Sequence, residues 1–243
     1  MIKHTKELAK IKEACAFFEP EGAFIAGGAL TSAFTGTTIN DVDIYFKSKE
    51  AFIAAVDMAY EERLWCVAAT DRAVTFIRGN DVIQLMHFDF FQTAEDIFDA
   101  FDFTVVMAAF DMDSNEFIFH EDFFKHASQR FLRFHNGTRY PYGSLMRVLK
   151  YQQRGYTIGK SDLLRIGLSC SKVEINSWED LANAIGGQYG DRAKIETDIP
   201  FSLEAADEMF RDTEFVFKAS EDMPSNADAL LIKIGMTDDN NRI

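Results

Sequence analysis

Several features that define common classes of protein are missing from this sequence. No apolar run approaches the roughly 18–20 residues that cross a membrane, and the longest, Phe103 to Phe110, has the length of a strand. The first residues contain no apolar stretch of the kind found in secretory signals. The three cysteines lie far apart and form no C-x-x-C pair, which argues against a disulfide framework and a zinc site. We therefore expect a cytoplasmic protein with reduced thiols and no membrane partner.

Three familiar catalytic signatures are also absent from the chain. It has no P-loop, no serine nucleophile elbow and no Rossmann glycine fingerprint. Disorder of the whole chain is excluded, because 47% of its 243 residues are hydrophobic, with 24 phenylalanines, and 26% are charged. The length indicates one large domain, or one domain with a smaller appendage.

Charge is distributed unevenly along the chain. The net charge is −14, which argues against indiscriminate binding to nucleic acid. Residues 120–172, however, contain ten basic and only three acidic side chains, a local charge of +7. This basic segment is either a phosphate-binding face, through which RNA or tRNA would bind, or a solvated helix surface balanced by acidic neighbours.

Hydrophobic periodicity and turn residues divide the chain into a mixed α/β part and an all-helical part. The predicted fold class is α+β, with a mixed sheet flanked by helices in residues 1–136, and helices in residues 137–243 that end in a polar, acidic tail from Ser220, loosely packed in part. Strands are predicted at Ala23–Ala26, Asp41–Phe46, Trp65–Ala68, Ala73–Ile77, Val82–Met86, Phe103–Phe110 and Glu116–Phe119. Helices are predicted at Lys6–Phe18, Ala29–Phe34, Lys49–Leu64, Ala94–Phe98, Gly143–Gln153, Ser161–Ser169, Trp178–Ile185 and Leu203–Phe217.

The pattern most informative about chemistry joins a glycine turn to a pair of aspartates. Gly27 and Gly28 lie between a predicted strand and a predicted helix, where backbone N–H groups can approach a phosphate. Asp41 follows Gly28 by thirteen positions, and Asp43 lies two residues further along the next strand. Residues two apart on a strand project from the same face, about 6.5–7 Å apart, so both carboxylates can reach one divalent cation. This order predicts a metal-dependent phosphate site.

The same order resembles the first motif of the nucleotidyltransferase superfamily, the DNA polymerase beta-like proteins, as found in the head domain of bacterial tRNA CCA-adding enzymes and poly(A) polymerases. Three further stretches are similar to that family and follow in the same order. Asp102–Asp111 resembles its second motif, Phe131–Phe134 resembles the strand that closes the head, and Ser144–Tyr156 resembles the first neck helix. The resemblance covers about residues 20–160 and implies a nucleotidyltransferase head in residues 1–136 joined to a neck-like helical domain.

The resemblance also implies a role for each residue of the first two motifs. Gly27 and Gly28 would hold the triphosphate of an NTP substrate. Asp41 and Asp43 would be both catalytic and metal-binding residues, as ligands of Mg²⁺ or Mn²⁺. Asp102 would help to position the sugar of the nucleotide. The implied reaction is transfer of NMP from an NTP to an acceptor, with an RNA 3′ end as the acceptor.

One face of the implied neck helix is basic. Arg147, Lys150 and Arg154 recur at i, i+3 and i+7, which brings them to one side of a helix. They would bind the triphosphate or the backbone of the acceptor, or else form a solvent-facing basic stripe.

The sequence departs from the family at the positions that read the base. The family selects C and A with a Glu-Asp-x-x-Arg motif, and the matching positions here are Tyr140, Pro141 and Ser144. Gln84 stands where a third carboxylate is expected, and Ala100–Phe101 replaces a pair of arginines. We therefore expect weak selectivity for the base. Two alternatives stay open: a catalytically weak or inactive nucleotide- or RNA-binding protein with this fold, and a small nucleotidyltransferase that modifies a protein or another non-RNA acceptor.

Overall fold

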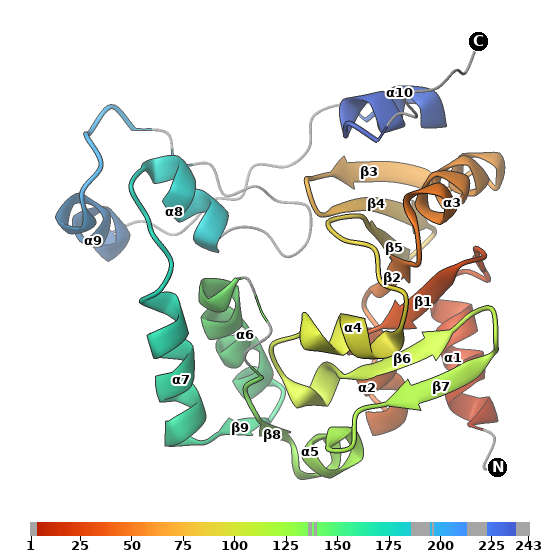
Figure 1. Ribbon diagram of the computed structural model, residues 1–243, viewed down its shortest axis with the longest axis horizontal. Helices are drawn as coiled ribbons and strands as arrows, with labels where there is room; N and C mark the ends of the chain where they lie inside the picture. Colours follow the sequence, from red (N-terminus) through yellow and green to blue (C-terminus); the bar gives the residue numbers. More distant parts are fainter. Residues whose placement is uncertain are drawn as a thin grey trace.

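One mixed sheet forms the centre of the first half of the chain (Figure 1). The computed structural model describes residues 4–135, 138, 140–185, 195, 197–212 and 223–236. Within them, the sheet consists of β1 (Ala23–Ala26), β2 (Val42–Phe46), β3 (Trp65–Ala69), β4 (Ala73–Arg78), β5 (Asp81–Met86), β6 (Ala108–Asp111) and β7 (Glu116–Phe119). The strand order is β3-β4-β5-β2-β1-β6-β7. Strands β2 and β5 are parallel, and the other neighbouring pairs are antiparallel. The predicted α+β class is confirmed.

Helices bury both faces of this sheet. The helices of the first half are α1 (Thr5–Ala14), α2 (Gly28–Thr35), α3 (Lys49–Glu61), α4 (Ala94–Asp99) and α5 (Phe123–Gln129). On β1, Ile25 joins the core shared with α1, α2 and α3, whereas Phe24 and Ala26 join the cluster that contains α4. A strand covered on both faces has no solvent side, which explains why β1 is apolar at all four positions.

Local capping and turn residues agree with the predicted elements. The Ser48 hydroxyl accepts a hydrogen bond from the Ala51 N–H at 3.1 Å and begins α3. Gly79 and Asn80 form the turn between β4 and β5, where Arg78 pairs with Asp81. None of the described helices has both the length and the apolar character needed to cross a membrane.

The predicted single strand from Phe103 to Phe110 is wrong. A 3₁₀ turn at Thr104–Val106 precedes β6. The Thr104 N–H donates to the Arg133 carbonyl at 3.2 Å, its hydroxyl lies 2.7 Å from His126 Nδ1, and the Val105 carbonyl accepts from the hydroxyl of a residue in α2. Because these long-range bonds satisfy the polar groups at the turn, the chain leaves the sheet there.

The segment Phe131–Phe134 does not close the large sheet, in contrast to the expectation from the resemblance. Its first two residues form β8 (Phe131–Leu132), which pairs in parallel with β9 (Thr157–Ile158) in a separate two-stranded sheet. Phe134 makes an isolated bridge to Phe103. Strand β9 is also a short exception to the all-helical second half.

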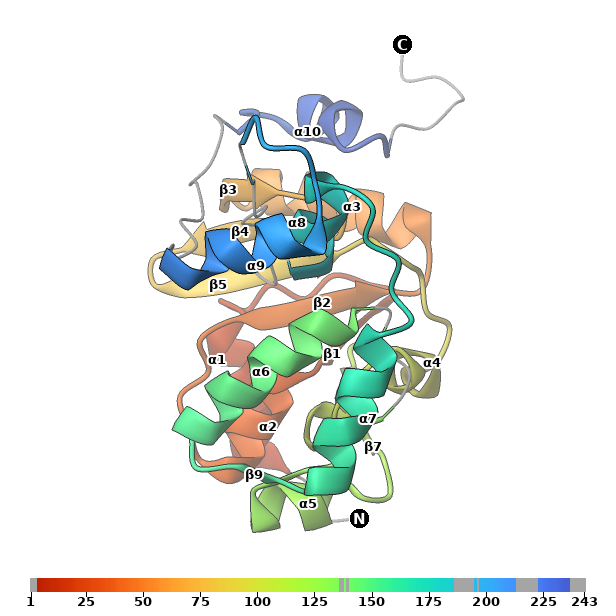
Figure 2. The same cartoon turned by 90° about the vertical axis from the view of Figure 1, so that its left-hand side faces the viewer.

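The described part of the second half contains five helices, the last of which packs against the first half. They are α6 (Pro141–Gln153), α7 (Lys160–Cys170), α8 (Trp178–Ile185), α9 (Leu203–Asp212) and α10 (Ala227–Lys233). Figure 2 views α6 and α7 side by side in front of the sheet, and these two helices contact each other. The predicted helix continuation at 213–217 lies outside the described residues, as do 220–222 and 237–243 of the predicted tail.

Helix α10 is a well-packed part of the predicted polar tail. Leu230 and Leu231 are buried and join the core beside α3. The Tyr60 hydroxyl in α3 also donates to the Pro224 carbonyl at 2.8 Å. Although this stretch is acidic in composition, α10 has a short apolar face. Burial of that face against α3 stabilises the position of α10.

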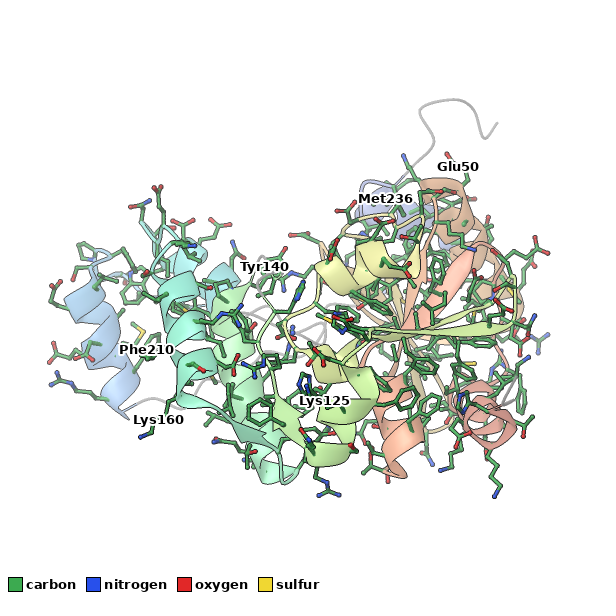
Figure 3. All side chains as sticks on the ribbon, turned by 60° about the horizontal axis from the view of Figure 1, so that its bottom comes forward. Glu50, Lys125, Tyr140, Lys160, Phe210 and Met236 are labelled. Atoms are coloured by element: carbon green, nitrogen blue, oxygen red, sulfur yellow. The ribbon has the colours of Figure 1, made fainter. Side chains whose placement is uncertain are left out.

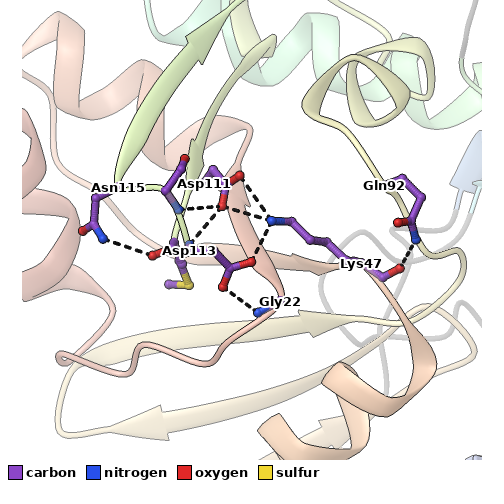
Figure 4. A network of polar contacts seen from close by, with 8 residues as sticks. Gly22, Lys47, Gln92, Asp111, Asp113 and Asn115 are labelled. Atoms are coloured by element: carbon purple, nitrogen blue, oxygen red, sulfur yellow. Dashed lines mark hydrogen bonds and ion pairs between the residues drawn. The ribbon is translucent and has the colours of Figure 1, made fainter.

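A lysine clamp joins three strands at the end of β1 that lies away from the glycine turn (Figure 4). Lys47 Nζ lies 3.2 Å from a carboxylate oxygen of Asp111 and 2.7 Å from one of Asp113. Asp113 in turn accepts the Gly22 N–H at 2.8 Å. The clamp fixes the ends of β1, β2 and β6 and so leaves their opposite ends in a defined register.

Candidate active site

The glycine turn presents an open helix end. Gly27 ends β1 and precedes α2 with φ of +86°, a conformation that side chains disfavour. A Cβ added to Gly27 would lie 3.6 Å from Asp43 Oδ2, whereas a Cβ on Gly28 would have no neighbour within 4 Å. The first N–H groups of a helix lack partners within the helix, and Gly27 supplies no side-chain cap. The turn therefore offers an anion-binding helix end beside an aspartate.

The aspartate pair lies at the start of β2, directly beside that turn. Asp43 is opposite Ala26 on β1 and Gln84 on β5, and Asp41 immediately precedes the strand. Burial and, after it, the charge of Asp41 raise the pKa of Asp43 to about 7. Burial likewise raises the pKa of Asp41. Two desolvated carboxylates that repel each other are stabilised in their charged form by a cation.

The basic face of the neck helix meets this pair. Arg147 and Lys150 lower the pKa of Asp43, and Lys150 and Arg154 lower that of Asp41, so the positive charges of α6 act on both carboxylates. Burial and the nearby Arg154 guanidinium lower the pKa of Lys150. This crowding of cations favours an anionic ligand such as a phosphate group.

A cavity of about 540 Å³ brings together all the residues that the sequence analysis assigned to catalysis, metal binding or nucleotide binding. Its lining includes Gly27, Gly28, Asp41, Asp43, Asp102, Arg147, Lys150 and Arg154. They come from the glycine turn, the start of β2, the segment before the 3₁₀ turn and α6. Arg139 of the basic segment lies outside the described residues.

Asp102 has a partner that the sequence did not reveal. Its carboxylate is buried, with 1% of the side chain exposed, and forms an ion pair with Arg147. The Asp102 carbonyl also accepts the His135 N–H at 2.7 Å. Asp102 therefore joins the sheet domain to α6 at the cavity wall. Its contact with a nucleotide sugar stays a prediction.

The three positions that replace the base-reading motif have different environments. Tyr140 lines the cavity, between the neck helices and the sheet domain (Figure 3). Pro141 is buried at the first turn of α6, and Ser144 is fully buried with no hydrogen-bond partner for its Oγ among the described residues. Only the tyrosine can contact a ligand.

Sequence reasoning missed Arg72 and a group of aromatic and acidic residues that line the cavity. The guanidinium carbon of Arg72 lies 3.3 Å from the centroid of the Tyr140 ring. No local pattern marks Arg72, because its partner is far away in the sequence. In the aromatic group, the Tyr45 ring contacts the rings of Phe88 and Phe101. Further residues that line the cavity are Asp89, Phe91, Asp96 and Asp99.

The residues present fit a cation that is only partly held by protein. Within the described chain no group of three or more His, Cys, Asp and Glu side chains is arranged to hold a metal. Gln84, beside Asp43, adds an amide in place of a third carboxylate. Magnesium commonly takes one or two carboxylates together with water and substrate phosphates. The aspartate pair suits that mode of binding.

Two solved structures share this fold. One is a Thermotoga maritima CCA-adding enzyme complexed with tRNA, with a TM-score of 0.51 and 14% identity over 74% of this chain and 44% of that one. The other is a CCA-adding enzyme with ATP, with a TM-score of 0.53 and 15% identity over 70% of this chain and 44% of that one. At this identity the likeness shows the fold, and the chain has the nucleotidyltransferase fold.

Sequence comparison points to a narrower group. A relative named Gabija anti-defense 2, from Bacillus phage SPbetaL7, is 45% identical over 168 residues, which make up 69% of this chain and 42% of the relative. The chain thus spans less than half the length of that relative. The model of the Gabija anti-defense 2 family matches residues 3–130, more than half of the chain and most of the sheet domain. The chain therefore belongs to the Gabija anti-defense 2 family.

Proposed function

We propose that this protein transfers a nucleoside monophosphate from an NTP to an acceptor hydroxyl, with an RNA 3′ end as the acceptor. One observation carries the proposal: the glycine turn, the aspartate pair and the basic face of α6 line a single cavity. Attack of the hydroxyl oxygen on the α-phosphorus forms a phosphodiester bond, displaces pyrophosphate and releases the hydroxyl proton. A divalent cation bound at the pair would favour the ionised hydroxyl and neutralise phosphate charge.

Three groups of residues would bind the phosphates, hold the cation and offset the negative charge of the triphosphate. The backbone N–H groups at the start of α2 bind phosphate oxygens, because Gly27 and Gly28 place no side chain in the way. Asp41 and Asp43 hold the cation. Lys150 approaches the same carboxylates from α6 and offsets negative charge on the triphosphate.

Gly28→Ala tests the phosphate role without disturbing the fold. Its Cβ would enter open space, so we expect unchanged stability but NTP affinity weaker by at least about tenfold, ~1.4 kcal/mol. Gly27→Ala is the comparison variant. Because residue 27 has a φ of +86°, which is unfavourable for alanine, this substitution should lower stability as well as NTP affinity. Calorimetric NTP binding and urea unfolding measure the two effects. Wild-type affinity in Gly28→Ala would contradict the assignment.

Selectivity among nucleotides should be weak. Tyr140, with Arg72 against its ring, offers stacking rather than a pattern of hydrogen bonds to one base. Phosphate and metal contacts are the same for all four NTPs. We expect affinities for ATP, CTP, GTP and UTP within about tenfold of one another, ~1.4 kcal/mol. Binding measured side by side checks this, and a preference for ATP and CTP of about a hundredfold would mean that specific base recognition survives.

The family name supports a biological role for the reaction. The relative is named for opposing Gabija defense, and we infer that this chain acts in the same antagonism. A second candidate, a nucleotide-binding protein without catalysis, is favoured by Gln84 beside Asp43, where a third carboxylate was expected.

Two experiments separate these candidates. The first incubates the protein with Mg²⁺, each labelled NTP and total RNA plus protein, and asks which macromolecule is labelled. Label in RNA supports the proposal, whereas label in protein would mean that the acceptor is a protein hydroxyl and not an RNA 3′ end. The second compares wild type with Asp43→Asn in cells that carry Gabija defense. Loss of antagonism supports catalysis, whereas full antagonism by the variant would favour the binding role.

A further inference from the structure

A second, smaller cavity adjoins the candidate active site. It has a volume of about 220 Å³ and shares Gly28, Asn40 and Arg154, among others, with the main cavity. The shared residues show that the two cavities lie side by side at the glycine turn, and Asn40 directly precedes Asp41. Pockets that enclose free small ligands usually exceed about 300 Å³. A cavity of this size suits part of a longer molecule that continues into the main site.

The chemistry of this groove differs from that of the rest of the protein. The described residues that line it include two arginines, five serine or threonine side chains and no acidic residue, although the chain as a whole carries a net charge of −14. The lining of the main cavity, by contrast, includes Asp89, Asp96 and Asp99, none of which lines the groove. A polyanionic strand would therefore be attracted more strongly to the groove than to the acidic part of the main cavity.

The Arg130 side chain contacts the backbone beside the groove. Arg130 Nη1 donates to the Arg154 carbonyl at 3.4 Å. Gly155, with φ of +82°, gives this guanidinium room, because a Cβ there would lie only 3.0 Å from Arg130 Nη1. Ser32, Thr38 and other small polar side chains line the same groove. Guanidinium groups together with hydroxyl donors suit the oxygens of a phosphodiester backbone.

We propose that this groove binds the 3′-terminal segment of a single-stranded nucleic acid and directs its hydroxyl toward Asp41 and Asp43. The inference rests on the proposed function, since it assigns the acceptor of that reaction to a site. Arg130 lines the groove but not the main cavity. It therefore belongs to acceptor binding and not to NTP binding.

The test measures strand binding without catalysis. A fluorescein-labelled single-stranded oligoribonucleotide with a free 3′ hydroxyl, and its DNA counterpart, are titrated with the full chain in the absence of NTP. Arg130→Gln should weaken binding about tenfold and lower the slope of log K against log salt by about 0.7. A separate variant, Thr38→Asp, adds a negative charge to the groove and should also weaken strand binding relative to wild type. Thr38→Asn, which adds no charge, should leave strand binding unchanged.

Lys125→Gln is the matched control. Lys125 lies on α5, the helix that ends just before Arg130, and lines neither cavity (Figure 3). The Lys125→Gln substitution removes one positive charge, as Arg130→Gln does, from a nearby position and should leave strand binding unchanged. Equal losses of strand affinity in Lys125→Gln and Arg130→Gln, or no loss in either, would overturn the assignment of strand binding to the groove.

NTP binding by calorimetry separates this inference from the proposed function. Unchanged NTP binding in Arg130→Gln, with weakened strand binding, supports the groove. Normal NTP binding by a wild-type protein that binds neither strand overturns the groove alone. A wild-type protein that binds no NTP overturns the proposed function, whereas Arg130-dependent strand binding in that protein would still support the groove.

Discussion

Asp43→Asn should abolish nucleotidyl transfer and, at the same time, make the metal-free protein more stable. The substitution removes a ligand charge with almost no change in volume. Transition-state stabilisation by a bound metal amounts to several kcal/mol, so we expect a loss of rate of at least about a thousandfold, ~4 kcal/mol. Asp41→Asn should have a comparable effect on rate. Transfer at wild-type rates in either variant would refute the catalytic assignment.

The gain in stability follows from the direction of the pKa shift. The Asp43 pKa is about 7 in the folded chain, above the value of about 4 for an exposed aspartate. Wild-type stability is therefore fully present below about pH 4 and falls as pH rises toward 7. We expect the free energy of unfolding of metal-free Asp43→Asn to exceed that of wild type by about 4 kcal/mol at pH 8, with little difference at pH 4.

Urea unfolding at the two pH values, with a chelator present, measures this difference. Asp207→Asn is the control, because Asp207 lies exposed on α9 in an ion pair with Arg211. It should change stability by no more than about 0.5 kcal/mol at either pH. A metal-free Asp43→Asn protein less stable than wild type at pH 8 would show that Asp43 is not desolvated as described.

Arg147→Met should be the most destabilising single substitution in α6. It leaves the buried Asp102 carboxylate without its guanidinium partner, and breaking a buried ion pair in this way costs about 3–5 kcal/mol. The double variant Asp102→Asn, Arg147→Met removes the uncompensated charge and should recover more than half of the loss. Chemical unfolding of the two proteins at pH 7 measures both effects.

The control for this prediction is an exposed pair. Arg211→Met breaks the ion pair with Asp207 on α9, where both side chains are largely exposed. It should change the free energy of unfolding by no more than about 1 kcal/mol. Equal effects of Arg147→Met and Arg211→Met would mean that the Asp102 pair does not hold α6 to the sheet domain.

Much of the fold was predictable because its signals are local. The four apolar residues of β1, the Ser48 cap of α3 and the Gly79 turn each act within a few residues of their own position. The glycine turn and the Asp41–Asp43 spacing are local as well, and the structure brings both to one cavity. Such features follow from backbone geometry and need no knowledge of distant contacts.

The errors arose where distant partners compete with local preference. Phe103–Phe110 has the composition of one strand, but hydrogen bonds from Thr104 to Arg133 and His126 break it. Arg72 reaches Tyr140 across a long stretch of sequence, and the same is true of Asp102 and Arg147. None of these pairs leaves a periodic signal in the chain.

The sequence by itself determined most of the strands and helices, the glycine turn and the charge of the α6 face, since each depends on neighbouring residues. Only the tertiary structure decided that Asp102 is buried against Arg147, that Tyr140 alone of the three replaced positions reaches the cavity, and that the groove beside Arg130 carries no acid among its described residues. Burial and cavity lining depend on which distant segments pack together. That packing sets the desolvation and the charge that each site residue experiences.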